Sequence, residues 1–405
     1  MATAMDTSMD KARSNMITES ITHPTWDSVV IGGGLAGCLA ARQLALRGQK
    51  VLLLEKQTFP RAKVCGSCLN SRAISSLRQV GLGNALHALG GKVTNRFQLF
   101  GFGRHLQCDV PEGLAISRGV LDEALLQEAR RAGVKVVNNV SAQVVPTTER
   151  KHHRVVRVQA NSASPLESQK DVHVHARTVV AADGLGHPSL RKLPEFQEKI
   201  RPGAKIGLGA IVEEPQWSSE VPSGDIQMYA SKYGYAGIVR AESDSIALAA
   251  AVDPSFIKER SKPADAFNQL LKDAGSSLQL SSTADWRGTP LLNRTINRVS
   301  SHRIFVVGDA AGYVEPFTGE GMAWAISGGV AVADCIQTGH DTSYDEAELE
   351  WQKAWQSQVR KRQKWCRALS WSLRKPTRAR LGIHLLSYHP SMSNLIAKQI
   401  AASTH

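Results

Sequence analysis

The chain has 405 residues and a formal net charge of +13, with 49 Lys and Arg against 36 Asp and Glu. This length predicts two or three domains with cores of their own, and the charge favours acidic partners or anionic surfaces. Six cysteines are too few for a disulfide framework and fit a reducing compartment. No run of 18 apolar residues predicts a membrane-spanning helix. Residues 1–25 are polar and lack a signal-peptide core, so we expect a disordered lead on a cytoplasmic protein.

The first recognisable unit is an apolar strand at 28–31 that runs into a glycine-rich turn. Gly32, Gly34 and Gly37 have Gly-x-Gly-x-x-Gly spacing, and a helix of small residues follows to about residue 47. Gly32 permits the tight turn and Gly34 lets a pyrophosphate approach the backbone, while Gly37 lets the helix and strand pack closely. This order of elements predicts dinucleotide binding.

Two further features of this unit support that prediction. The helix start leaves free N–H groups, at Leu35 and Ala36, that would face the phosphates with the positive end of the helix dipole behind them. The next strand, 50–55, ends in Glu55, 18 residues after Gly37. A carboxylate at this place can accept hydrogen bonds from a ribose diol.

The chain then alternates short helices and strands. We expect helices at 71–79, 82–89 and 116–129, the last amphipathic with an acidic start. We expect strands at 97–102, 105–110, 134–137 and 142–146, a β-ribbon at 154–159 and 172–175, and a buried strand from 178 that ends in Asp183-Gly184.

A block of strands separated by Gly, Pro and Ser follows, at 205–212, 225–230, 235–242 and 245–252, and a helix at 264–274 comes next. The buried-strand pattern returns at 303–307, before Gly308-Asp309 and a long helix that begins near Gly319. We therefore predict a discontinuous first domain (26–95, 115–195 and 285–345), an inserted domain (96–114 and 196–284) and a basic helical C-terminal segment (346–405).

Three motifs in this order are specific to one group of proteins. They are the glycine turn at Gly32, the segment Val180-Ala-Ala-Asp183-Gly184, and the segment Val307-Gly308-Asp309-Ala-Ala-Gly312-Tyr-Val-Glu-Pro316-Phe-Thr-Gly319-Glu-Gly321. Together they resemble the two-domain flavoprotein superfamily of para-hydroxybenzoate hydroxylase, which includes aromatic hydroxylases, flavin halogenases and geranylgeranyl reductases. The resemblance covers residues 27–395, and the Pro-Arg-x-x-x-Cys-Gly loop at 60–66 is closest to the geranylgeranyl reductase and halogenase branch.

The resemblance implies an α/β fold, with a three-layer Rossmann-like FAD-binding domain around a parallel sheet and an inserted antiparallel-sheet substrate domain. It implies that Arg118, at a helix start, contacts the FAD pyrophosphate and ribityl chain, and that Asp183-Gly184 contacts FAD and NAD(P)H. Asp309 would accept the ribityl hydroxyl. The other implied cofactor-binding residues are Lys56, Arg61, Gly66, Gly308, Pro316, Gly319, Glu320, Gly321 and Met322, and the helix start at 319–322 would stabilise reduced flavin.

Cys65-Gly-Ser-Cys68 is open to several interpretations. Zinc would need two more ligands at suitable spacing, so we expect no metal site. A redox pair needs a thiolate near a helix start, which Cys68 approaches. In the resembled reductases a Cys-Gly lies beside the flavin, which would place Cys65 in the cavity; a purely structural thiol is an equal alternative.

The inserted domain departs from the resembled patterns. It has Tyr233-Gly-Tyr235-Ala-Gly-Ile where the reductases carry Tyr-x-Trp-x-Phe-Pro and the halogenases carry Gly-Trp-x-Trp-x-Ile-Pro. The missing tryptophan and proline argue against halogenation. Tyr235 and Cys65 are our candidate cavity residues, and cross-strand packing is the alternative role for the tyrosine.

The C-terminal segment has ten Lys or Arg and no Asp or Glu between residues 353 and 380, with interleaved tryptophans at 355, 365 and 371. This pattern fits either a solvated helix packed on the core or a peripheral helix at the inner membrane face. Nothing else in the sequence supports nucleic-acid binding.

The sequence thus predicts an FAD-dependent oxidoreductase. Our first hypothesis is a monooxygenase that hydroxylates a hydrophobic, phenolic or polyketide-like small molecule through a flavin C4a-hydroperoxide. The alternatives are geranylgeranyl reductase-like reduction of isoprenoid double bonds and an electron-transfer flavoprotein that acts with protein partners. Since there is no second Gly-x-Gly-x-x-Gly unit, we expect NAD(P)H to bind transiently, or a reductase or ferredoxin to supply the electrons.

Overall fold

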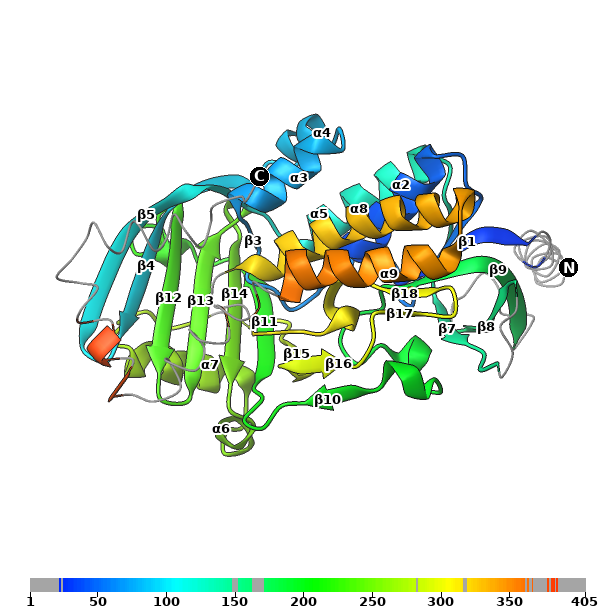
Figure 1. Cartoon of the computed structure of the whole chain (residues 1–405). Helices are drawn as coiled ribbons and strands as arrows, with labels where there is room; N and C mark the ends of the chain where they lie inside the picture. The colour runs from blue at the N-terminus through cyan, green and yellow to red at the C-terminus, as the bar shows by residue number, and fades with distance from the viewer. Residues whose placement is uncertain are drawn as a thin grey trace, which may run out of the picture.

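The computed structural model describes residues 22, 25–147, 152–161, 171–281, 283–315 and 319–360, together with 363, 366, 377–378, 380–382 and 384. Two large sheets organise this part of the chain (Figure 1). The helices are α2 Leu35–Leu46, α3 Ser71–Gln79, α4 Gly83–His87, α5 Arg118–Arg131, α6 Pro254–Lys258, α7 Pro263–Asp273, α8 Glu320–Asp341 and α9 Tyr344–Trp355.

The first sheet has the strand order β17-β18-β9-β1-β2-β6, with the ribbon of β7 and β8 added beside β9. Strands β18, β9, β1, β2 and β6 are parallel to one another. Their bounds, with those of the paired short strands, are β1 Trp26–Ile31, β2 Val51–Leu54, β6 Lys135–Val137, β7 Val140–Val144, β8 Arg154–Ala160, β9 Val172–Ala181, β10 Glu198–Ile200, β16 Arg294–Ile296, β17 Ser300–Ser301 and β18 Ile304–Val306.

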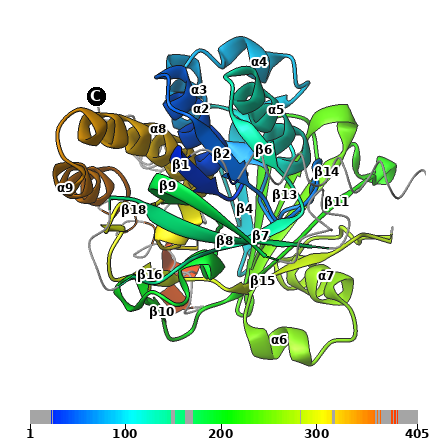
Figure 2. The ribbon, with the colours of Figure 1, turned by 90° about the vertical axis from the view of Figure 1, so that its right-hand side faces the viewer.

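Apolar runs form the centre of this sheet because parallel strands are covered on both faces. The four residues of β2 are all buried, and β18 is buried throughout. Helices α2, α5 and α8 lie along one face (Figure 2), and the ribbon of β7 and β8 continues the sheet on the other side. Helix α8 can approach α2 closely because Gly329 has no side chain. A Cβ at this position would lie only 2.4 Å from the carbonyl oxygen of Ala36.

The second sheet has the order β15-β11-β14-β13-β12-β4-β5-β3 and is mainly antiparallel. Helix α7 covers one face, where Phe267 and Leu270 are fully buried. The strand bounds are β3 Cys68–Leu69, β4 Lys92–Gly101, β5 Arg104–Ala115, β11 Ile206–Val212, β12 Asp225–Ser231, β13 Gly234–Arg240, β14 Ile246–Val252 and β15 Arg287–Leu291. Chain segments from before residue 116 and after residue 205 therefore share one sheet.

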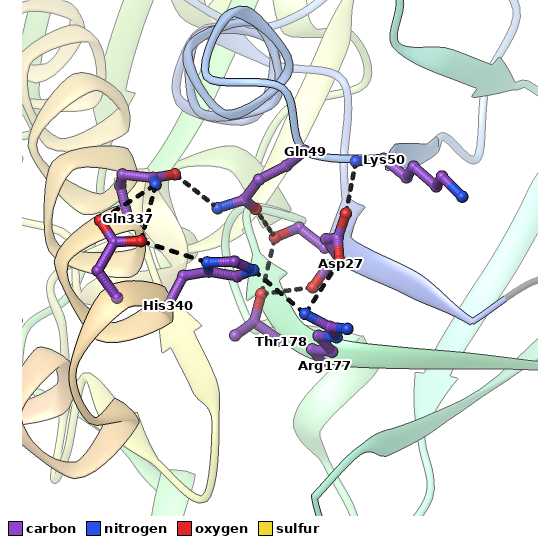
Figure 3. A network of polar contacts seen from close by, with 9 residues as sticks. Asp27, Gln49, Lys50, Arg177, Thr178, Gln337 and His340 are labelled. Carbon is purple, nitrogen blue, oxygen red and sulfur yellow. Dashed lines mark hydrogen bonds and ion pairs between the residues drawn. The ribbon is translucent and has the colours of Figure 1, made fainter.

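A polar network fixes the C-terminal end of α8 on the first sheet (Figure 3). The Gln49 amide donates to Gln337 at 3.1 Å, and Arg177 contacts the His340 ring at 3.1 Å. Asp27, at the start of β1, accepts from the Lys50 backbone at 2.8 Å. Because these contacts hold the C-terminal end of α8, the helix has a fixed direction, and its N-terminal end lies toward the other end of the sheet.

The predicted α/β fold with a parallel and an antiparallel sheet is confirmed. Some local expectations were wrong. The strands expected at 172–175 and from 178 are one strand, β9, because its alternating half in the ribbon continues directly into a fully buried half in the sheet. The predicted domain bounds stay a prediction; the second sheet also takes in β3 and β15, which lie outside the range proposed for the inserted domain.

Most of the basic segment lies outside the described residues, including the tryptophans at 365 and 371. In its described part, α9 continues into one π-helical turn at Gln356–Arg360. Within the described residues, no helix combines the length and apolar character needed to cross a membrane.

Candidate functional site

The glycines of the turn after β1 have different structural roles. Gly32 adopts φ +104°, and a Cβ there would lie 2.4 Å from the Ala182 carbonyl oxygen, so the turn abuts the end of β9. A Cβ on Gly37 would lie 1.9 Å from the Gly32 oxygen. Gly34 is different, because its nearest side-chain atoms are guanidinium nitrogens of Arg61 and Arg118, 3.5 and 3.8 Å from the Cβ position. Gly32 and Gly37 thus pack against backbone atoms, whereas Gly34 faces two positively charged side chains.

Those two guanidinium groups share one buried carboxylate. Asp122 is fully buried and accepts from Arg118 Nε and Nη2 at 2.7 and 2.9 Å, and it lies 3.1 Å from Arg61 Nη2. Burial works against the charged form of Arg118, but Asp122, together with Cys65 and Asp309, raises the pKa above its usual range. Two cations on one anion leave a net positive charge at the N-terminus of α2, and the buried Arg61 Nε has no partner. A pyrophosphate fits this charge and this unused donor.

Asp122 belongs to the helix that the sequence predicts at 116–129 with an acidic start. This helix, α5, begins at Arg118, and its Asp122 is fully buried. Ser117 is the N-cap, and its hydroxyl accepts from the Val120 N–H at 3.4 Å.

Glu55 stands at the end of β2, as predicted. Its carboxylate accepts from the Gly33 N–H at 2.6 Å and from the Gln57 N–H at 2.9 Å, and the residue is only 7% exposed. The acid therefore fixes the glycine turn from the neighbouring strand. Lys56 follows it directly and is exposed.

Asp183 lies beside this turn at the end of β9. One carboxylate oxygen accepts from the Ser189 N–H at 2.8 Å, while its other oxygen and the Ser189 hydroxyl are buried without partners. Burial raises the pKa of Asp183, although the hydrogen bond from the Ser189 N–H opposes the shift. Gly184 follows at φ +81°. The buried polar atoms of Asp183 and Ser189 that lack hydrogen-bond partners fit a polar ligand at this place.

The third motif continues from β18. Gly308 has φ +62° and packs on Ala36, so Asp309 comes close to the glycine turn. The Asp309 carboxylate pairs with Lys63 at 3.4 Å, a partner from the loop after β2 that the sequence did not indicate. Pro316 lies outside the described residues.

The start of α8 has a capping glycine and a buried acid. Gly319 is the N-cap with φ +70°, and Gly321 and Met322 lie in the first turn of the helix. The Glu320 carboxylate accepts from Arg72 at 2.6 Å and from Asn70 at 3.0 Å, both at the start of α3. Its side chain therefore joins two helices, and its backbone is the part that can face a ligand.

Two tyrosines and a carboxylate lie where the third motif meets the second sheet. Burial raises the pKa of Tyr313 well above its usual value, and the nearby Asp309 and Cys65 add to this. Burial also raises the pKa of Tyr235 on β13, and the nearby Glu315 carboxylate adds to this shift. Tyr313 is thus an electrostatic neighbour of both predicted cavity residues, Cys65 and Tyr235.

Cys68 of the cysteine pair has the character of a neutral thiol. Burial raises the pKa of Cys68 to about 12, with Cys65 adding to the shift, and the Cys68 thiol donates to the Gly66 carbonyl at 3.1 Å. Cys65 Sγ accepts from the Ser67 N–H at 3.4 Å. A neutral Cys68 disfavours the redox-pair interpretation. Among the described residues, no three His, Cys, Asp or Glu side chains are arranged to hold a metal ion.

Sequence reasoning missed Asp122, Tyr313, Glu315 and Asn293. Tyr313 and Glu315 lie inside the third motif, so their position next to Asp309 was a usable signal. Asn293 carried no signal, because its contact with Glu315 joins segments 22 residues apart.

A family profile described as an FAD binding domain matches residues 25–362. The chain belongs to this family. It binds FAD and is an FAD-dependent oxidoreductase, in agreement with the predicted superfamily and cofactor. The positively charged groups at Gly34 and the buried atoms of Asp183 and Arg61 that lack hydrogen-bond partners fit such a cofactor.

Individual relatives are similar to this chain over most of its length, at 17–26% sequence identity. Conditioned medium factor receptor 1 of Dictyostelium discoideum is 26% identical over 330 residues, which are 75% of this chain and only 61% of that receptor. Menaquinone reductase of Mycobacterium tuberculosis (strain CDC 1551 / Oshkosh) is 26% identical over 335 residues, 77% of this chain and 76% of the reductase. A flavoprotein/dehydrogenase structure from Cytophaga hutchinsonii superposes with a TM-score of 0.74 at 17% identity, covering 93% of this chain and 92% of that one, and shows the shared fold.

Proposed function

We propose that the chain is a monooxygenase that hydroxylates a hydrophobic phenolic molecule. The observation that carries this proposal is the buried Glu315 carboxylate, which lies close to the Tyr235 hydroxyl and to Tyr313. When bound, reduced FAD would supply the electrons that activate O₂. The chain's own residues then need to bind the phenol, orient it and take its proton.

Tyr235 and Glu315 can do the last of these. A tyrosine hydroxyl can donate to a carboxylate and accept from a substrate phenol at the same time. A proton could then move from the phenol to the Tyr235 oxygen as the tyrosine proton moves to Glu315. The ring becomes more electron-rich as it loses that proton, which favours attack on it by activated oxygen.

Apolar side chains beside Tyr235 support a hydrophobic substrate. Leu99, Leu106 and Met228 form a buried cluster on the second sheet, and Tyr235 and Phe97 pack against it. Tyr229 belongs to the core against α7, so the two tyrosines serve different packing environments. A substrate ring held near Tyr235 would meet an apolar wall on one side and one hydroxyl group on the other.

We also propose how FAD is held. Gly32, Gly34 and Gly37, with the start of α2, would bind the pyrophosphate together with Arg61 and Arg118. Glu55 would contact the adenosine ribose, and Asp309 would exchange Lys63 for a ribityl hydroxyl. NAD(P)H, or a reduced protein donor, would bind only transiently.

The test measures hydroxylation of a 4-alkylphenol under ¹⁸O₂ with NAD(P)H as the donor, by mass spectrometry. Tyr235→Phe should retain FAD and lose about 10²-fold in rate, the usual contribution of a positioned acid–base group. Tyr229→Phe is the matched control, since it removes a hydroxyl that donates to Gln227 on the same strand. No ¹⁸O in the product, or equal rates for both variants, would contradict the proposal.

Reduction of an isoprenoid double bond is the second candidate. It is supported by the similarity to menaquinone reductase and by the raised pKa of Tyr235, which keeps this hydroxyl protonated as a proton donor. Anaerobic reduction of menaquinone by the NAD(P)H-reduced protein, without any ¹⁸O incorporation in the aerobic assay, would favour this candidate over hydroxylation.

A further inference from the structure

We propose that Asn293 is a positioning residue that orients the Glu315 carboxylate toward the Tyr235 hydroxyl. This inference rests on the proposed function for its meaning in turnover, and on contacts within the protein for its geometry. Asn293 lies in the tight turn between β15 and β16 and is 5% exposed.

The backbone conformation of Asn293 indicates that its side chain has a role besides forming the turn. Its φ is +56°, in the left-handed region, where glycine is free of steric cost and other residues are uncommon. Asparagine tolerates the region better than most residues, but a glycine would make the same turn with less strain. The amide group is what distinguishes asparagine from glycine here.

Both ends of that amide contact one residue. Asn293 Oδ1 accepts from the Glu315 N–H at 2.9 Å, and Asn293 Nδ2 donates to Glu315 Oε2 at 3.3 Å. The first bond fixes the backbone of residue 315, and the second fixes the rotation of its carboxylate. Since a carboxylate has about four acceptor sites, it can bond Asn293 and Tyr235 together.

Neighbouring contacts hold the turn itself. Arg294 exchanges both backbone hydrogen bonds with Tyr313, at 2.8 and 2.9 Å. The Asn293 carbonyl accepts from the Arg201 N–H at 3.0 Å, and the Leu292 N–H donates to Lys205 at 2.7 Å. The turn is thus anchored to the segment that leads into β11, and it holds the Tyr313–Glu315 loop against the second sheet, where Tyr235 lies.

Two substitutions separate positioning from a backbone role. Asn293→Gly keeps the left-handed turn and removes the amide. Asn293→Asp keeps an acceptor for the Glu315 N–H but faces Glu315 with a second carboxylate. If Asn293 positions Glu315, the glycine variant should lose roughly 10- to 100-fold in kcat with FAD affinity retained, as for a lost hydrogen bond to a charged group, and the aspartate variant should lose more. Asn139→Gly, at another left-handed asparagine, is the matched control.

A double-mutant cycle tests the route of the effect. In the Glu315→Gln background, Asn293→Gly should cost less than threefold, because residues that act through one contact are not additive. Full additivity would overturn the positioning role.

A readout without turnover separates this inference from the proposed function. In protein labelled with ¹³Cζ-tyrosine, the Tyr235 resonance, assigned with Tyr235→Phe, should titrate at a lower pH in Asn293→Gly and in Glu315→Gln than in the wild type. Tyr313, Glu315 and Cys366 are the titratable neighbours of Tyr235. A shifted resonance with no hydroxylation by the wild type would refute the function and keep the positioning role. An unchanged resonance in Asn293→Gly would overturn the positioning role.

Discussion

Two alanine substitutions in the glycine turn should fail for different reasons. In Gly37→Ala the new Cβ would lie 1.9 Å from the backbone oxygen of Gly32, far inside van der Waals contact. Neither atom can rotate away, so α2 must shift from β1. Overpacking usually costs about 1–3 kcal/mol, and this contact belongs at or above the upper limit. At roughly 2–4 °C per kcal/mol for a large domain, Tm should fall by about 6–12 °C with or without FAD.

Gly34→Ala should leave the apoprotein almost unchanged. The backbone at Gly34 has φ −82°, which any residue adopts, and the nearest atom to the new Cβ is a flexible guanidinium nitrogen at 3.5 Å. We expect less than about 1 kcal/mol of lost stability for an alanine at this capping position. The same methyl group would block the proposed pyrophosphate. Losing two hydrogen bonds to a charged group, at about 1.5–3 kcal/mol each, corresponds to a roughly 10²- to 10⁴-fold weaker Kd.

The assay combines thermal unfolding of the apoproteins with FAD titration by quenching of flavin fluorescence. Gly34→Ala should have wild-type Tm and lost FAD affinity, whereas Gly37→Ala should have a lowered Tm in both states. Wild-type FAD affinity in Gly34→Ala would refute the proposed pyrophosphate position, and wild-type stability of Gly37→Ala would refute the packing argument.

Three other variants or conditions test the site. Asp122→Asn should destabilise the apoprotein by about 3–5 kcal/mol in chemical denaturation, because it leaves two buried guanidinium groups uncompensated, and FAD should recover part of the loss; equal loss in both states would contradict the shared site. Because the pKa of Tyr235 is raised above its ordinary value of about 10, its hydroxyl stays protonated up to and beyond pH 10. In Glu315→Gln the alkaline limb of the kcat–pH profile should therefore move to lower pH. An unmoved limb would show that Glu315 does not control the protonation of Tyr235. Since the pKa of Cys68 is raised to about 12, iodoacetamide at pH 8 should modify it about 10³-fold more slowly than a free cysteine, with Cys68→Ser as the mass-spectrometric control; fast labelling would restore the redox interpretation.

Short-range chemistry explains which features the sequence predicted. The glycine turn, Glu55 and α3 depend on neighbours within a few residues or on one strand–helix–strand unit, and the structure has them where the pattern indicated. The three motifs are likewise local, and their combination was enough to predict the superfamily and FAD. Asp122 shows the limit, because an acid in an amphipathic helix has the same sequence pattern whether it meets water or two arginines.

What the sequence by itself determined was therefore the cofactor and the class of fold, since glycines without side chains and buried apolar strands leave few alternatives. Only the tertiary structure decided which polar groups meet at the reaction site. Tyr235, Glu315 and Asn293 come from β13, the loop before α8 and the turn before β16, segments that no local pattern relates. They meet because the second sheet packs against that loop, and burial then forces each polar group to find a partner.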